Sequence, residues 1–110
     1  MSAGQVTKEA AAAAGSGAFA AVGDRWLFSG ALTFDDAMAV LEQAAELPLP
    51  QSGIVDMAGL VHADSAALAV LLELRKRGAA EKRRLSFTAL PPMLESLARV
   101  YGIEDLLFAQ

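Results

Sequence analysis

The sequence alternates short strand-like segments with longer helix-like ones over most of its 110 residues. Residues 18–22 and 25–30 are apolar and aromatic runs on either side of a Gly-Asp pair, which predicts a β-hairpin. Residues 54–57 form a short apolar run and residues 85–90 alternate apolar with polar side chains, so both are expected to be strands. Strands that alternate with helices favour an α/β fold, in which helices pack on a mixed β-sheet.

Three helices are expected between and after these strands, at residues 33–47, 64–77 and 91–101. Thr33 begins the first in a variant of the capping box, and two prolines end it. Gly78 is expected to end the second, and a Pro-Pro pair opens the third. The expected order is therefore β-β-α-β-α-β-α, followed by a short terminal element that is either a strand or a docked helix.

The apolar positions of the first two helices fall on wide faces. In the first helix, spacings of three and four predict one buried face, made by Phe34, Ala37, Met38, Leu41, Ala44 and Ala45. In the second helix, four side chains fall on one face of a helical wheel: Ala67, Val70, Leu71 and Leu74. Leu68 and Leu72 lie to one side of that face, so they belong either to a broad core stripe or to an edge that contacts a partner.

The N-terminal segment differs in composition from the rest of the chain. Residues 1–17 are predicted to be a flexible tail, and residues 18–110 one domain. The alanine run in the tail lacks the long, strongly apolar stretch of a secretory signal peptide. No apolar run approaches a membrane span of about 18 residues. We therefore expect a cytoplasmic protein with no direct membrane span.

The composition argues against several classes of function. Cysteine is absent and His62 is the only histidine, which removes thiolate and His-rich metal sites and leaves no base–nucleophile pair for a serine triad. Nine basic residues against 13 acidic ones give a net charge of −4, which disfavours nucleic-acid binding. We expect no catalytic residues, no metal and no cofactor, and hence a protein that is not an enzyme.

Basic residues are concentrated in one short stretch. Six of the nine lie within ten positions: Arg75, Lys76, Arg77, Lys82, Arg83 and Arg84. They either complement the negative end of a helix dipole or form a patch that faces an acidic partner or anionic lipid headgroups. The sequence leaves both interpretations open.

Asp64 and Ser65 stand at the start of the second helix and have two interpretations. Either side chain can accept a hydrogen bond from an unpaired backbone N–H of the first turn, which is ordinary capping. Ser65 is also a candidate phosphorylation site, because a phosphate there meets the positive end of the helix. The neighbouring carboxylate of Asp64 opposes this by like-charge repulsion.

Residues 54–68, IVDMAGLVHADSAAL, resemble the core signature of STAS domains, the sulphate-transporter and anti-sigma-factor-antagonist domains. In that signature a strand ending in Asp is followed by a connector and then by Asp-Ser before a helix. Residues 87–107 contain the run Pro-x-x-Leu-x-x-Leu-Ala-x-x-Tyr-Gly, which is similar to the MlaB-type members of the family. The resemblance covers residues 18–108 and includes the order of the elements, so it implies the STAS fold.

The resemblance also implies a function. MlaB-type domains are non-enzymatic cytoplasmic subunits of an inner-membrane ABC phospholipid transporter, so the expected partners are an MlaF-like ATPase subunit and, through it, the membrane permease. The family's binding surface carries over to Asp64, Ser65 and the exposed side of the following helix, where Leu68 and Leu72 are the expected contacts. Whether the isolated domain forms a homodimer through that edge stays open.

A second function within the family is an anti-sigma factor antagonist that is switched by phosphorylation of Ser65. Many antagonists have glycine two positions after this serine, where the present chain has Ala67. Glycine permits close backbone approach, whereas alanine favours simple helix. This difference favours the transporter hypothesis over the antagonist.

Overall fold

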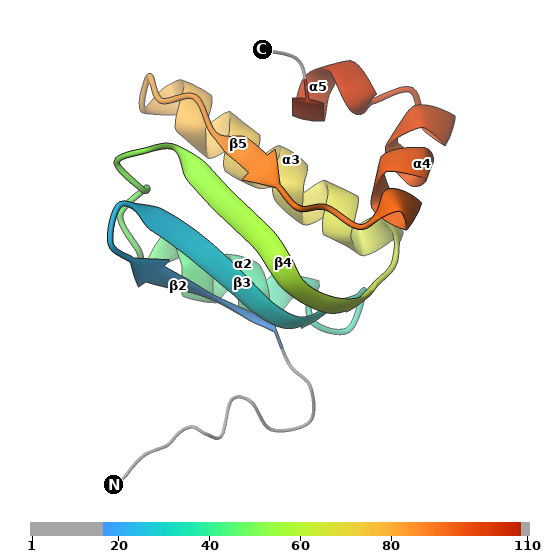
Figure 1. The fold of residues 1–110 in the computed structure, drawn as a ribbon, viewed down its shortest axis with the longest axis horizontal. Helices are drawn as coiled ribbons and strands as arrows, with labels where there is room; N and C mark the ends of the chain where they lie inside the picture. Colours follow the sequence, from blue (N-terminus) through green and yellow to red (C-terminus); the bar gives the residue numbers. More distant parts are fainter. Residues whose placement is uncertain (1–16, 109–110) are drawn as a thin grey trace, which may run out of the picture.

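The computed structural model describes residues 17–108, in which four strands and four helices alternate (Figure 1). The strands are β2 (Ala18–Val22), β3 (Arg25–Leu32), β4 (Ile54–Ala63) and β5 (Ser86–Thr88). The helices are α2 (Ala37–Ala45), α3 (Ser65–Ala80), α4 (Pro92–Val100) and α5 (Glu104–Phe108). The predicted element order is confirmed, and the terminal element is a helix. All of the predicted tail except Gly17 lies outside the described residues.

The strands form one mixed sheet in the order β2-β3-β4-β5. The hairpin is present: β2 pairs antiparallel with β3, and Val22 faces Arg25 across a two-residue Gly-Asp loop. The pairs β3–β4 and β4–β5 are parallel. Parallel crossovers are almost always right-handed, so two that step in the same direction place their helices on the same face. Figure 1 shows α2 and α3 together behind the sheet.

The burial of the strands follows from this one-sided covering. Along β3, Trp26 and Phe28 are buried while Leu27 and Ser29, which point to the other face, are exposed. Buried side chains of the strands belong to the hydrophobic core, among them Phe19, Trp26, Phe28, Leu32, Val55 and Met57. The opposite face of the sheet is covered by no helix in the described residues.

Gln43 ties α2 to the outer edge of the sheet. Its side-chain Nε2 donates to the Phe19 carbonyl (2.8 Å), and its Oε1 accepts from the Phe19 N–H (2.9 Å). Because β2 is an edge strand, these backbone groups have no strand partner on that side. A side chain of α2 thus supplies the hydrogen bonds that a further strand would make.

Arg77 joins α3 to the end of α2. Its guanidinium donates to the carbonyl of Ala44 (3.1 Å), in the last turn of α2, and to that of Leu47 (2.6 Å), just beyond the helix. The same group lies 5.9 Å from the centre of the Trp26 ring, and the indole N–H donates to the Pro48 carbonyl (3.0 Å). One arginine of the basic stretch therefore acts inside the fold.

Two predicted boundaries are wrong. The strand expected at residues 54–57 is longer than predicted, because residues 58–63 continue β4 and pair with β3 as far as Ala63. Gly78 lies inside α3 and does not end it. A Cβ at Gly78 would lie 2.9 Å from the Arg83 carbonyl, so the glycine allows the following loop to fold back onto the helix.

The buried face predicted for the first helix is confirmed only in part: Ala44 is buried and Ala37 and Leu41 pack against the core, whereas the other three residues are exposed. Thr33 and Asp36 do interact, since the Thr33 hydroxyl donates to the Asp36 carboxylate (2.9 Å), but α2 begins only at Ala37. Its fully buried side chains are Val40 and Ala44. Phe34 and Met38, expected in the core, are 81% and 70% exposed.

Replacing Gln43 by Met tests how much its two hydrogen bonds to the Phe19 backbone stabilise the fold. Methionine keeps the length of the side chain and removes both hydrogen bonds, so we expect the free energy of unfolding to fall by about 1–2 kcal/mol. Glu42→Met, at an exposed neighbouring position of the same helix, should change it by less than about 0.5 kcal/mol. Urea denaturation of both variants measures the free energy of unfolding, and equal values would show that the Gln43 hydrogen bonds contribute nothing to stability.

Candidate functional site

An open groove runs between α2 and α3 and is called here the α2–α3 groove. It has a volume of about 750 Å³. Its lining consists of Phe34, Ala37, Met38, Leu41, Asp64, Ser65, Ala66, Ala69, Val70 and Glu73. The groove exists because the two helices share one face of the sheet and because α3 contributes mainly small side chains to its floor.

Asp64 fixes one end of the α2–α3 groove. One carboxylate oxygen accepts from the Ala66 N–H (2.8 Å) and caps α3, while the other accepts from the Phe34 N–H (3.1 Å). The carboxylate therefore links the start of α3 to the loop before α2, across 30 positions of the sequence. The capping interpretation of Asp64 is confirmed, and the bond to Phe34 adds a second structural role.

Ser65 is the first residue of α3 and is exposed on the rim of the α2–α3 groove. Within residues 17–108 its hydroxyl has no hydrogen-bond partner, so the side chain is accessible to a partner or a modifying enzyme. The N–H groups of Ala66 and Ala67 already donate to the carboxylate and the carbonyl of Asp64. A phosphate on Ser65 would therefore compete with Asp64 for the donors at this helix end.

Phe34 and Met38 make the α2 side of the groove apolar. Both are large side chains, and both are mostly exposed although they stand beside Ala66 and Ala69 in the groove lining. Sequence reasoning assigned them to the core because their spacing fits a helical period. The start of the helix at Ala37, which leaves Phe34 in the preceding loop, is what turns this face outward.

The charges on the groove are acidic. Asp64 and Glu73 belong to its lining and no basic residue does, although Lys76 pairs with Glu73 (3.3 Å). Asp35 and Glu42 are exposed and directly follow the lining residues Phe34 and Leu41 in the sequence. An apolar groove with an acidic rim suits a partner surface that carries apolar and basic side chains.

The other two predicted contact residues do not lie in this groove. Leu68 is 2% exposed and belongs to the core, so its expected place on an exposed, partner-binding edge is wrong. Leu72 is half-buried and lines a separate hollow with Leu106 of α5. The helices α4 and α5 pack against α3 and widen its buried face, which a helical wheel of α3 alone does not reveal.

Metal-binding and membrane-spanning features were also sought. Within residues 17–108, no group of three or more His, Cys, Asp and Glu side chains gathers closely enough to hold a metal ion. The imidazole of His62 is exposed on β4. None of the helices in the described part of the chain is long and apolar enough to cross a bilayer.

A family model described as "Mlab, STAS domain" matches residues 28–108. The chain belongs to the MlaB-type STAS domain family. The matched region runs from β3 to α5 and includes every residue of the α2–α3 groove. A comparison with curated proteins gave no match.

Asp64→Ala should lower the stability of this STAS domain. It removes the cap of α3, worth about 1 kcal/mol, and the bond to the Phe34 N–H, worth about 0.5–1.5 kcal/mol. Ser65→Ala should leave the free energy of unfolding within about 0.5 kcal/mol of the original, because its hydroxyl makes no bond in residues 17–108. Chemical denaturation measures both, and an Asp64→Ala variant as stable as Ser65→Ala would contradict the linking role.

Proposed function

We propose that this STAS domain is a non-enzymatic, cytoplasmic subunit that binds the ATPase subunit of an inner-membrane ABC phospholipid transporter. In this proposal it supports the assembly and activity of the transporter and stays peripheral on the membrane through that complex. The partner is an MlaF-like ATPase and, through it, the permease. The proposal rests on family membership together with the α2–α3 groove.

The observation that carries the proposal is the exposure of Phe34 and Met38 beside Ser65. Large apolar side chains that gather on the surface of a small domain are typical of contact sites for a partner. Asp64 links the start of α3 to the loop before α2 in the isolated domain. This link lowers the conformational entropy that is lost when a partner binds. The acidic rim favours an ATPase surface that presents arginine or lysine around an apolar centre.

Met38→Asp tests the site. The substitution places a charge in the apolar part of the groove, and we expect it to weaken binding to the co-expressed ATPase by at least about tenfold. Val100→Asp is the matched control, because Val100 is also a highly exposed apolar residue, 77% exposed, but lies on α4. Co-purification and titration measure both variants, and equal affinities would remove the groove from the interface.

Ser65 is tested by a pair of variants. Ser65→Glu adds a negative charge to an already acidic rim and should weaken the complex, whereas Ser65→Ala should bind as the original chain does. Isothermal titration with the purified ATPase separates the two. Unchanged affinity for Ser65→Glu would show that the contact does not reach the start of α3.

A second candidate function is the anti-sigma factor antagonist, which the exposed, unbonded hydroxyl of Ser65 favours. Here a serine kinase would phosphorylate Ser65, and the added phosphate would displace the partner from the groove. Incubation with a cognate kinase and ATP, followed by mass spectrometry, tests it. Absence of a phosphate on Ser65 would leave the transporter hypothesis.

A further inference from the structure

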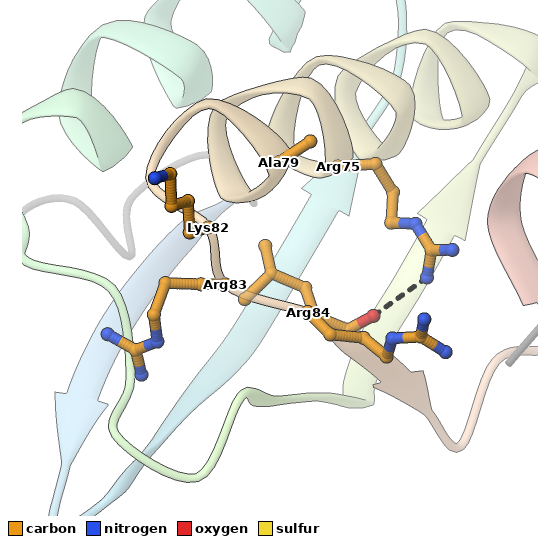
Figure 2. A pocket seen from close by; sticks show the side chains of 6 residues that line it. Arg75, Ala79, Lys82, Arg83 and Arg84 are labelled. Carbon is orange, nitrogen blue, oxygen red and sulfur yellow. Dashed lines mark hydrogen bonds between the residues drawn. The ribbon is translucent and has the colours of Figure 1, made fainter.

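A second hollow lies at the other end of α3, where the chain turns back towards β5. It has a volume of about 350 Å³ and is lined by Arg75, Ala79, Lys82, Arg83, Arg84 and Leu85 (Figure 2). Four of these six side chains are cationic, and none is acidic. We call these four, Arg75, Lys82, Arg83 and Arg84, the basic cluster.

The backbone beneath the basic cluster is held firmly. Lys82 has a φ of 59°, which reverses the chain after α3, and the Arg83 N–H donates to the Gly78 carbonyl (2.7 Å). The Arg83 guanidinium donates to the Pro50 carbonyl. Arg75 donates to the carbonyls of Leu85 (2.8 Å) and Leu107 (3.3 Å). The fold therefore fixes the backbone of this loop and the guanidinium groups of Arg75 and Arg83.

Part of the basic cluster lacks neutralising partners. Lys82, Arg83 and Arg84 are consecutive, and within residues 17–108 none of them forms an ion pair. By contrast, Lys76 and Arg77 of α3 pair with Glu73 and Glu81. Three consecutive cations without an ion pair raise the local positive potential, which favours the approach of an anion.

The acidic groove does not cancel this charge. Asp64 and the three consecutive cations Lys82, Arg83 and Arg84 stand beyond opposite ends of the 16-residue helix α3, a separation of roughly 24 Å at about 1.5 Å per residue. Screening acts over about 10 Å at 0.1 M salt, so a surface that approaches these three cations experiences little of the Asp64 charge. Glu73 of the groove lies nearer, but its carboxylate is paired with Lys76.

The surroundings of the basic cluster indicate the kind of anion. An adjacent hollow shares Arg75 and Ala79 with the first one and adds Leu72, Glu73, Lys76 and Leu106, of which Glu73 is paired with Lys76 and Leu106 is 59% exposed. Cations beside an exposed leucine are typical of surfaces that lie on lipid headgroups. The lining of neither hollow contains an aromatic side chain on which a nucleic-acid base would stack.

We propose that the basic cluster docks on the surface of an anionic phospholipid membrane, with its cations at the headgroup phosphates and Leu106 at the interface. This contact is distinct from the α2–α3 groove, because the two linings share no residue. It therefore stands or falls separately from the proposed binding of an ATPase, and it would orient the groove away from the membrane.

Vesicle co-sedimentation of the full chain tests the proposal. We expect binding at low salt to phosphatidylcholine vesicles that contain phosphatidylglycerol, and none to phosphatidylcholine alone. Lys82→Gln/Arg84→Gln should lower the partition coefficient by about 25-fold, at roughly fivefold for each charge. Arg25→Gln/Arg99→Gln removes the same charge from exposed positions outside the basic cluster and should lower it by less than about twofold.

Three results would overturn the proposal. Absence of binding to the anionic vesicles would leave an acidic protein as the partner of the basic cluster. Equal losses in the two double variants would mean that only net charge matters. Release by inorganic phosphate well below the ionic strength at which NaCl acts would indicate a site for free phosphate. Thermal unfolding followed by circular dichroism verifies that both double variants are folded.

Discussion

The covering of only one face of the sheet is the constraint on which the rest of the structure depends. Two parallel crossovers that step in the same direction bring α2 and α3 to the same side, over the aromatic side chains of β2 and β3. Gln43 and Arg77 then fix the two helices by hydrogen bonds to backbone groups at the edge of the sheet and at the end of α2. The side-by-side placement of α2 and α3 creates the α2–α3 groove.

The helix α3 connects two chemically different ends of the molecule. At its start, both oxygens of Asp64 are occupied by backbone N–H groups, so this carboxylate shapes the groove while Ser65 stays accessible. At its far end, Gly78 lets the basic loop fold back onto the helix. Both proposed contacts, with a protein at the groove and with a membrane at the basic cluster, would operate by binding alone.

The hairpin, the element order and the start of α3 were predictable because Gly, Pro and Asp-Ser patterns mark them locally. The length of β4 was not, since its second half owes its extended form to pairing with β3. Leu68 was misplaced because α4 and α5, which come later in the chain, also pack against α3 and give it a wider buried face than a wheel of α3 alone indicates. The helical spacing of Phe34 and Met38 is compatible with a buried face and with an exposed one. Only the position in which α2 packs on the sheet shows that both side chains are exposed.

Hydrogen–deuterium exchange of the domain, alone and in complex with the ATPase, tests the central claim most directly. The account predicts that binding slows exchange in the loop before α2, in α2 and in the first half of α3, while α4 and α5 exchange as in the isolated domain. Protection confined to α4 and α5, with the groove unchanged, would contradict it.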